Sequence, residues 1–320
     1  MFGVVENLNW IEALRARLGD AVETDAEVLG QHAHDETEDL QFPPQAVVRA
    51  RSREDVVATR EVAHAFGVPV TAAGARTGLS GGALAVQGGI ALSLKGMDRV
   101  VEVDLANHQV RVQPGVIVQE LQERVQRDGL FYAVDPASRG TCTIGGNLAE
   151  NSGGPRAVKY GGTKDWVLNL EVVLADGQVI RTGADTLKNS TGYNLTQLMV
   201  GSEGTLGVIT EATLKLLPWP RHNALMLVPF RSAEAACAAV AAIFQAGGQP
   251  SALEFMERDA VLLAQDFTGD HSLEVGADVA APLVIEVDGF RAEELMPQVE
   301  ALLPVLEAAG AGEPLFADDA

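Results

Sequence analysis

Apolar residues recur every three or four positions from Leu8 to Leu18, which predicts a helix near the N-terminal end of the chain. Further along, two short apolar runs, 46–50 and 68–73, have the length and composition of buried strands. Between them, Ser52 begins an amphipathic segment that Gly67 ends, so a capped helix is expected there. The order strand, helix, strand predicts a βαβ unit.

The middle of the chain alternates between hairpin-like runs and one helical segment, and the pattern changes after Pro218. The runs predict strands at 100–103, 109–112, 166–174, 178–181 and 208–217, and a helix over 116–127. After Pro218 we expect strands at 224–229 and 283–287 and helices at 232–246 and 292–309. This renewed alternation predicts a second module of sheet and helices from about residue 221.

A glycine-rich loop follows the apolar run 68–73 and contains one cation, Arg76, among its glycines and hydroxyl side chains. Glycines let a backbone approach a ligand closely, and consecutive free N–H groups form a concave site for an anion. The loop has neither the Gly-Lys-Ser/Thr of a P-loop nor the glycine spacing of a dinucleotide fingerprint. A second strand-like run, 90–94, follows it, so the loop is predicted to bind a phosphate or pyrophosphate without a helix.

Two further glycine-rich stretches occur, at 135–162 and at 201–207. The first has seven glycines in 28 residues, far more than a connection of about 4–6 residues requires. Long ordered loops are usually functional, and residues 143–147 of this one are expected to begin a short helix facing a ligand.

Charge is distributed unevenly along the 320 residues, and the total is −21. Residues 1–40 carry a net −8, residues 41–230 carry +1, and residues 231–320 carry −14. Nucleic-acid binding requires a basic surface, so the chain is not expected to bind nucleic acid. The acidic flanks are interpreted as solvated helix faces, whereas the near-neutral middle accommodates an anionic ligand.

Few features suggest a metal site or membrane attachment. Cys142 and Cys237 provide neither a disulfide framework nor a metal clip, which suits a reducing, cytoplasmic compartment. No apolar run approaches the length of a membrane span, and residues 1–20 lack the basic start of a secretory signal. The segment 32–36 contains two histidines, but further ligands at a defined spacing are missing, so we expect an acidic surface segment and no metal.

Seven short segments, in this order, resemble the FAD-binding domain of the vanillyl-alcohol oxidase/p-cresol methylhydroxylase flavoprotein superfamily. They are Arg-Thr-Gly-Leu-Ser-Gly-Gly at 76–82, Pro-Gly-Val at 114–116, Asp-Pro at 135–136, Thr-Ile-Gly-Gly-Asn at 143–147, Asn-Ser-Gly-Gly at 151–154, Lys-Tyr-Gly at 159–161 and Gly-Ser-Glu-Gly-Thr-Leu-Gly-Val-Ile-Thr at 201–210. Within the superfamily, the chain is most similar to the FAD-linked D-2-hydroxyacid dehydrogenases, a group that includes the glycolate oxidase catalytic subunit, D-lactate dehydrogenase and D-2-hydroxyglutarate dehydrogenase.

The resemblance implies an α+β fold with a two-subdomain FAD-binding domain of the p-cresol methylhydroxylase type, followed by a partial α/β cap domain. It implies an N-terminal helical segment at 1–40, the FAD-binding domain at 41–220 and the partial cap at 221–320. The cofactor-binding residues that it implies are Arg76, Thr77, Gly78, Leu79, Ser80, Gly81, Gly82, Pro114, Pro136, Ser138, Thr143, Ile144, Gly145, Gly146, Asn147, Asn151, Gly153, Gly154, Tyr160, Glu203, Gly204, Gly207 and Ile209. The first loop would bind the FAD pyrophosphate, and the second would surround the flavin and its ribityl chain.

The chemistry that the resemblance implies is oxidation of a D-2-hydroxyacid, such as lactate, glycolate or 2-hydroxyglutarate, to the 2-oxo acid. Electrons would pass from the reduced flavin to a second acceptor, such as a quinone or an electron-transfer protein. The first loop has no histidine, and Cys142 does not stand in the family's setting for covalent attachment, so noncovalent FAD is expected. A companion subunit or a homodimer is a further expectation.

The histidine-rich motif and the carboxylate-binding arginine of these dehydrogenases do not occur in this sequence. After residue 230 the chain offers Arg231, Arg258, Arg291 and His271, and none stands in that motif, so the catalytic residues stay unknown. Two alternatives are therefore kept. One is a truncated or non-catalytic FAD-binding subunit that needs a partner chain, and the other is an NADPH-dependent enoylpyruvate-sugar reductase built on the same module.

Overall fold

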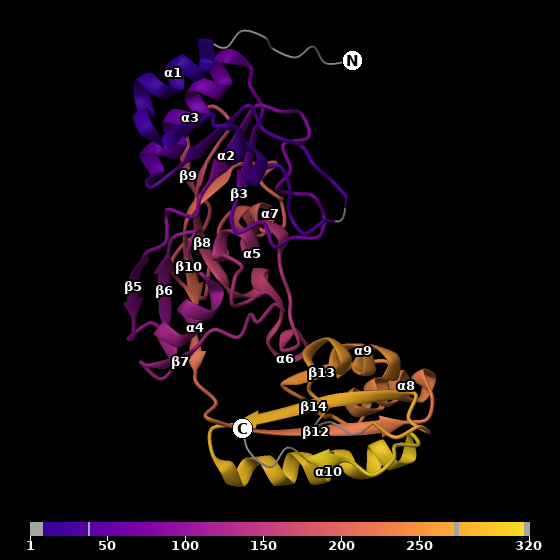
Figure 1. The fold of residues 1–320 in the computed structure, drawn as a ribbon. Coiled ribbons are helices and arrows are strands. Elements are labelled where there is room, and N and C mark those ends of the chain that lie inside the picture. Colours follow the sequence, from indigo (N-terminus) through magenta and orange to yellow (C-terminus); the bar gives the residue numbers. More distant parts are fainter. Residues whose placement is uncertain (1–8, 38, 272–274, 317–320) are drawn as a thin grey trace. The chain divides into compact units, whose positions relative to one another are not determined.

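The computed structural model describes residues 9–37, 39–271 and 275–316, and the chain forms two compact units within it (Figure 1). The first unit comprises Met1–Gly153 and Gly162–Pro218, and the second comprises Gly154–Gly161 and Trp219–Ala320. The change of pattern after Pro218 therefore coincides with the last passage of the chain from one unit to the other. Nothing in the sequence pattern indicates that residues 154–161 belong with the second unit.

The first unit begins with a four-stranded sheet of order β1-β2-β4-β3, in which β2, β4 and β3 are parallel and β1 is antiparallel to β2. Its elements are α1 (Asn9–Leu18), the 3₁₀ turn Gly19–Ala21, β1 (Val22–Glu23), α2 (Ala26–Gln31), β2 (Ala46–Arg49), α3 (Arg53–Phe66), β3 (Val70–Ala73) and β4 (Ile90–Ser93). The predicted βαβ unit is confirmed. Ser52 and Asp55 form a capping box at the start of α3, and Gly67 ends the helix in the left-handed conformation.

Helix α1 joins the core of this sheet through its buried face. Trp10 and Leu14 are fully buried, and they belong to one hydrophobic cluster with Val48, Ile90 and Leu92 of the strands. The predicted helical period is thus confirmed over the described residues, while Leu8 lies outside them. This packing holds β3 and β4 side by side, so the glycine-rich loop that joins them leaves the sheet from a fixed edge.

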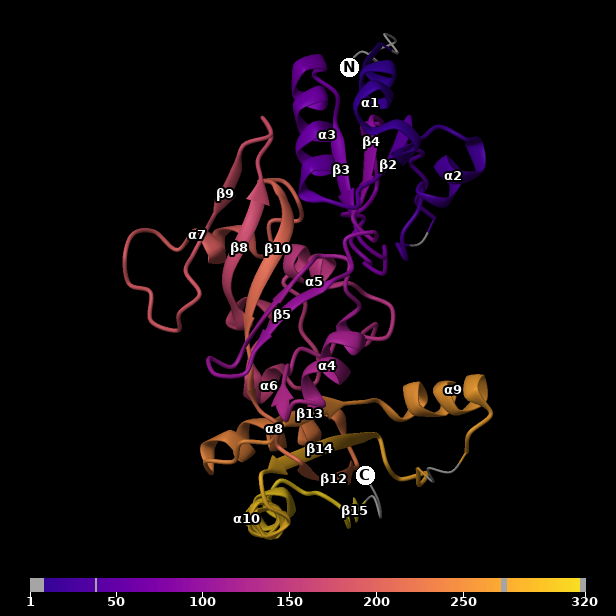
Figure 2. The same cartoon turned by 90° about the vertical axis from the view of Figure 1, so that its left-hand side faces the viewer.

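The second part of the first unit contains a five-stranded antiparallel sheet of order β5-β6-β10-β8-β9 and a separate two-stranded sheet of β11 and β7. Its elements are β5 (Val100–Asp104), β6 (Gln109–Val112), α4 (Val118–Gln126), β7 (Leu130–Phe131), α5 (Ile144–Glu150), the 3₁₀ turn Thr163–Trp166, β8 (Val167–Val173), β9 (Val179–Arg181), α7 (Leu195–Met199), β10 (Val208–Lys215) and β11 (Leu217–Pro218). The predicted hairpins are confirmed. A wide loop joins β9 to α7 (Figure 2) and exposes Leu187 and Tyr193.

The second unit is built on an antiparallel sheet of order β13-β14-β12-β15. Its elements are α6 (Ala157–Tyr160), β12 (His222–Phe230), α8 (Ala233–Gln245), β13 (Ala252–Phe255), α9 (Arg258–Thr268), β14 (Ala281–Gly289), the 3₁₀ turn Ala292–Glu294, α10 (Leu295–Ala308) and β15 (Leu315–Phe316). Alternate residues of β12 and β14, such as Met226 and Ile285, form one hydrophobic cluster with Ile243 of α8 and Leu302 of α10. This alternation confirms the predicted strands and helices of the module.

Three features differ from the sequence-based expectations. The segment 32–36 is not a plain surface segment, because His32 and Asp35 are buried. Strand β13 and helix α9 were not predicted, since β13 is only four residues long and Val261 is the buried residue of α9. The helix expected at 292 begins with a 3₁₀ turn instead.

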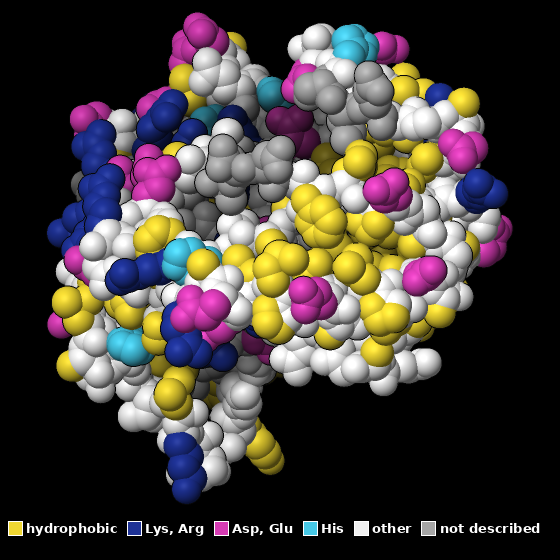
Figure 3. Space-filling model, turned by 90° about the horizontal axis from the view of Figure 1, so that it is seen from below, with side chains coloured by type: hydrophobic (Ala, Val, Ile, Leu, Met, Phe, Trp, Pro, Cys, Tyr) yellow, Lys and Arg dark blue, Asp and Glu magenta, His cyan; other side chains and the backbone are white. Residues whose placement is uncertain are grey.

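Hydrophobic side chains also reach the surface of the second unit. Phe290, Met296 and Phe316 are each about half exposed. Figure 3 shows hydrophobic side chains gathered on the face seen from below, with single acidic side chains between them. Among the described residues, no helix has the length and apolar character needed to cross a membrane.

Candidate functional site

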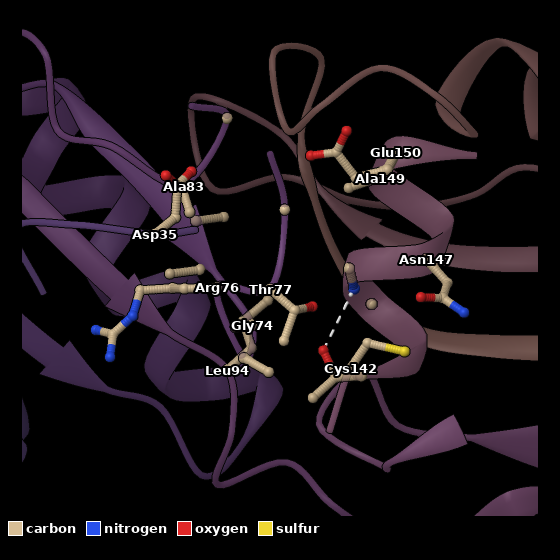
Figure 4. A pocket seen from close by; sticks show the side chains of 18 of the residues that line it. Asp35, Gly74, Arg76, Thr77, Ala83, Leu94, Cys142, Asn147, Ala149 and Glu150 are labelled. Atoms are coloured by element: carbon tan, nitrogen blue, oxygen red, sulfur yellow. Dashed lines mark hydrogen bonds between the residues drawn. The ribbon is translucent and has the colours of Figure 1, made fainter. Parts of the chain in front are cut away.

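A pocket in the first unit lies between the glycine-rich loop after β3 and the turn that leads into α5 (Figure 4). The cavity itself measures about 140 Å³, less than the roughly 300–1,000 Å³ typical of small-molecule sites. Arg76 and Thr77 lie on one wall, and Cys142, Asn147 and Glu150 lie on the other.

The first wall offers consecutive backbone N–H groups. None of the N–H groups from Ala75 to Ala83 donates a hydrogen bond to another described residue. The chain turns through positive φ at Arg76 (61°) and again at Gly81 (76°), which bends the loop. Free N–H groups in such a bend form an anion site, so the loop has the geometry that the sequence predicted for a phosphate.

Arg76 adds a positive charge to this wall. Its side chain is partly buried and makes no hydrogen bond or ion pair with a described residue. Burial is the main cause that lowers the pKa of its guanidinium, Arg49 lowers it further, and Asp35 raises it. In Figure 4 the side chain extends away from the wall that carries Asn147.

The second wall is the start of the seven-residue helix α5. Thr143 caps it, with its Oγ1 accepting a hydrogen bond from the Gly146 N–H at 3.4 Å. Asn147 is 3% exposed, and its Nδ2 has no hydrogen-bond partner among the described residues. An unpaired buried amide donor is unfavourable unless a ligand accepts its hydrogen bond, so the position fits a ligand with an acceptor.

Two glycines allow close packing around the pocket. A Cβ at Gly74 would lie 2.4 Å from Thr143 Oγ1 of the other wall, and a Cβ at Gly145 would lie 2.6 Å from Pro114 Cβ. A side chain at either position would have to displace these atoms. The narrow space therefore depends on glycine for its shape, as a close backbone approach to a ligand requires.

Three carboxylates line the same pocket: Asp35, Glu150 and Glu203. Ser80 Oγ donates to Glu150 Oε2 at 3.4 Å. Burial raises the pKa of Glu150, and the charge of Glu203 raises it further. Carboxylates repel a phosphate but accept hydrogen bonds from hydroxyl groups, so the pocket suits a ligand that carries both.

The pocket also contains a buried thiol. Cys142 is 4% exposed, and burial raises the pKa of its thiol. A protonated thiol is a weak nucleophile.

Twelve of the residues proposed from the sequence line this pocket, and eleven do not. Those in the lining are Arg76, Thr77, Gly78, Gly82, Pro114, Ser138, Thr143, Gly145, Gly146, Asn147, Glu203 and Gly204. Those elsewhere are Leu79, Ser80, Gly81, Pro136, Ile144, Asn151, Gly153, Gly154, Tyr160, Gly207 and Ile209. Ile144 and Ile209 are core residues, and Asn151 caps the end of α5.

Sequence reasoning missed several lining residues. Gly74 and Glu150 adjoin proposed segments, so a wider window around those segments would have included them. Asp35 lies about 40 residues before the glycine-rich loop, outside every recognised segment. No local signal pointed to it.

Tyr160 belongs to the second unit, where it takes part in a polar cluster. Its hydroxyl donates to Asp288 Oδ2 at 2.6 Å, and Lys159 pairs with Asp288 Oδ1. Arg156 pairs with Glu286 at 3.4 Å. These hydrogen bonds and ion pairs bind α6 and the preceding Arg156 to β14.

The cations noted after residue 230 are placed in the second unit. Arg291 pairs with Glu294 at 2.8 Å, Arg258 donates to the Gly276 carbonyl, and Arg231 is largely exposed beside Asp278. His271 is exposed. Within the described ranges, no group of three or more His, Cys, Asp or Glu side chains has a metal-binding arrangement.

Comparisons with known proteins agree with this fold. Residues 44–183 match the family described as FAD binding domain, and residues 219–320 match the FAD linked oxidases, C-terminal domain. A D-lactate dehydrogenase of Anaerostipes hadrus is 38% identical over 98% of this chain and 66% of its own length. The glycolate oxidase subunit GlcD of Bacillus subtilis is 39% identical over 85% of this chain and 57% of its own.

Solved structures of lower identity share the fold. An alkyldihydroxyacetonephosphate synthase has a TM-score of 0.79 at 21% identity, covering 95% of this chain and 60% of that chain. A p-cresol methylhydroxylase with substrate bound has a TM-score of 0.78 at 19% identity, covering 96% of this chain and 65% of that chain. The predicted α+β fold of the p-cresol methylhydroxylase type is thereby confirmed. The chain spans about 57–66% of the length of the two curated relatives.

Proposed function

Because the chain belongs to the family of FAD-linked oxidases, we propose that it serves the FAD-dependent oxidation of a D-2-hydroxyacid to the corresponding 2-oxo acid. The similarity to relatives named for D-lactate and for glycolate carries this proposal. Both names denote 2-hydroxyacids, and the two matches extend over 98% and 85% of this chain, so they include residues of both units.

The residues of the pocket fit FAD as the bound cofactor. We assign the pyrophosphate to the free N–H groups of the glycine-rich loop and to Arg76, whose planar guanidinium suits a phosphate. Gly74 and Gly145 keep the pocket narrow, and Asn147 Nδ2 donates to an acceptor of the cofactor. When bound, FAD supplies the two-electron acceptor for the oxidation.

Of the remaining residues inferred from the resemblance, those of the first unit stay within this proposal as further parts of the cofactor site. A substrate carboxylate requires a cation, most naturally an arginine. The cations noted after residue 230 make local contacts or face solvent, and none of them lines the pocket of the first unit. We therefore name no catalytic base and no carboxylate-binding residue.

The reduced cofactor has to pass its electrons on, and we propose a second acceptor, such as a quinone or an electron-transfer protein. A cytoplasmic location is part of the same proposal. The second candidate function is that of a FAD-binding subunit that needs a partner chain for turnover. The relative from Bacillus subtilis favours it, since that protein is named a subunit of glycolate oxidase.

The test is an absorption spectrum of the purified chain, followed by anaerobic addition of D-lactate, glycolate or D-2-hydroxyglutarate, with L-lactate as the stereochemical control. Flavin bands that bleach with a D-2-hydroxyacid and persist with L-lactate would establish the oxidation. Bands that persist with every hydroxyacid would favour the partner-dependent subunit. Bleaching by NADPH alone would contradict both proposals and favour the reductase alternative.

A further inference from the structure

One carboxylate oxygen on the pocket wall is buried and has no hydrogen-bond partner in the described ranges. Asp35 is 7% exposed and lines the pocket. Its Oδ1 accepts a hydrogen bond from the Thr37 N–H at 2.9 Å, whereas its Oδ2 is shielded from solvent and unpaired among the described residues. An unpaired buried acceptor is unfavourable, and a charged one more so, which makes Asp35 Oδ2 a candidate to receive a hydrogen bond from a ligand.

The position of this carboxylate is fixed against the glycine-rich loop. Thr37 orients it from one side, and the neighbouring Glu36 donates its N–H to the Gly78 carbonyl at 3.2 Å. Figure 4 shows Asp35 on the same wall as Arg76, next to Ala83. Asp35 is therefore held beside the loop whose free N–H groups suit a phosphate.

The neighbouring charges define which ligand group fits there. Arg76 is close enough for the two charges to affect each other, but no ion pair joins it to Asp35. A carboxylate accepts hydrogen bonds and donates none, so it cannot bind a phosphate. The arrangement of a free guanidinium and a free carboxylate oxygen suits a ligand in which a phosphate adjoins a hydroxyl group.

We propose that Asp35 is a FAD-binding residue whose Oδ2 accepts a hydrogen bond from a sugar hydroxyl next to the pyrophosphate. The inference rests on the FAD site proposed above. FAD carries such hydroxyls on both sides of its pyrophosphate, on the ribose and on the ribityl chain. The ribose hydroxyls and the ribityl hydroxyls both have the required chemistry. Separate binding measurements with each half of the cofactor distinguish the two.

The experiment measures flavin affinity for the full chain, stripped of cofactor, by quenching of FAD fluorescence. In Asp35→Asn, the amide oxygen retains the bond from Thr37, which places the NH₂ group where Oδ2 was. The acceptor becomes a donor, so the Kd for FAD is expected to rise at least about 10-fold. Asp39→Asn makes the same change at an exposed position of the same segment and is expected to bind FAD like the wild type.

Competition with FMN and with ADP then locates the hydroxyl. A weaker ADP affinity with unchanged FMN affinity in Asp35→Asn assigns the ribose, and the reverse assigns the ribityl chain. Unchanged or tighter FAD binding in Asp35→Asn would overturn the proposal, because a carboxylate that only repels the phosphates predicts tighter binding when neutralised.

Thermal unfolding of the cofactor-free protein separates binding from folding. Asp35→Asn removes a buried charge that lacks a partner, so its midpoint is expected to equal or exceed that of the wild type. A lower midpoint would contradict the proposal, since it would show that Asp35 serves the fold. None of these measurements uses a hydroxyacid, so failure of the oxidation test leaves this one intact.

Discussion

Two aspartates with nearly the same burial lie in opposite surroundings in the two units. Asp288 is 6% exposed, and its carboxylate binds the Lys159 ammonium and the Tyr160 hydroxyl. Asp35 is 7% exposed and leaves one oxygen unpaired within the part of the chain that the structure describes. Burial alone therefore does not distinguish the two carboxylates, whereas the number of hydrogen bonds that each accepts within the fold does.

The same difference extends to the neighbours of each aspartate. Around Asp288, Glu286 accepts from Ser251 at 3.2 Å and pairs with Arg156. Beside Asp35, Arg76 has no partner among the described residues, and neither has Asn147 Nδ2 on the opposite wall of the pocket. The cluster of the second unit thus stabilises the fold without a ligand, whereas the pocket of the first unit requires a ligand to satisfy its polar groups.

The largest expected effect is a loss of folding stability when the polar cluster around Asp288 is broken. Asp288→Ala leaves Lys159 and Tyr160 without their shared acceptor. The free energy of unfolding should fall by about 3 kcal/mol, the lower end for a broken buried pair, because a quarter of the Lys159 side chain is exposed. Denaturant unfolding of the cofactor-free protein measures it. Asp278→Ala, which removes a largely exposed carboxylate, is the control, and equal losses in the two variants would contradict a structural role for Asp288.

The second largest expected effect is a loss of FAD affinity when the shape of the pocket is changed. Gly74→Val places side-chain atoms against Thr143 Oγ1, in the space between the two walls. Overpacking costs typically about 1–3 kcal/mol, and where this cost falls on the FAD-bound state, the Kd for FAD should rise roughly 5- to 150-fold. The ratio of flavin to protein absorbance after gel filtration reports this loss. Gly30→Ala, at a helical glycine with open space around it, is the control and should retain the flavin. Full flavin content in Gly74→Val would show that FAD binding does not depend on the shape of this pocket.

The smallest expected effect is the dependence of FAD affinity on pH. The pKa of Glu150 is raised in the folded protein, mainly by burial. Its contribution to stability is therefore fully present below the unfolded pKa of about 4.5 and is lost as the pH rises through the raised folded value. FAD affinity should follow the same direction, since the deprotonated carboxylate repels the pyrophosphate.

Measuring the Kd for FAD from pH 5 to pH 8 checks this prediction. The wild type should bind more weakly by a few-fold at the alkaline end, because partly exposed charges are worth only about 0.2–1 kcal/mol. Glu150→Gln should flatten this dependence, while Glu120→Gln, exposed on α4, should leave it unchanged. A slope that survives in Glu150→Gln would assign the titration to another group.

Local patterns predicted much of the fold. Ser52 and Gly67 marked the ends of α3, and the helix expected over 116–127 is present as α4, with Val118, Leu121 and Val125 buried on one face. The glycine-rich loop joins two strands without a helix, as expected. These features depend on residues close together in the chain, which is why the sequence alone predicted them.

Features that depend on distant contacts were not predicted. The burial of Asp35 depends on the loop around Gly78, more than 40 residues away. The place of α6 in the second unit depends on Asp288, almost 130 residues further along. No periodicity or motif in the sequence encodes such a contact.

The assignment of α6 to the second unit means that the two units are interleaved in the gene. The similarity to the FAD linked oxidases' C-terminal domain begins at residue 219, yet the unit that folds there also includes Gly154–Gly161, inside the segment 44–183 that matches the FAD binding domain. A recombinant exchange at Trp219 would carry Asp288 away from Lys159 and Tyr160. An exchange of this module that keeps these contacts therefore has to include both stretches of sequence.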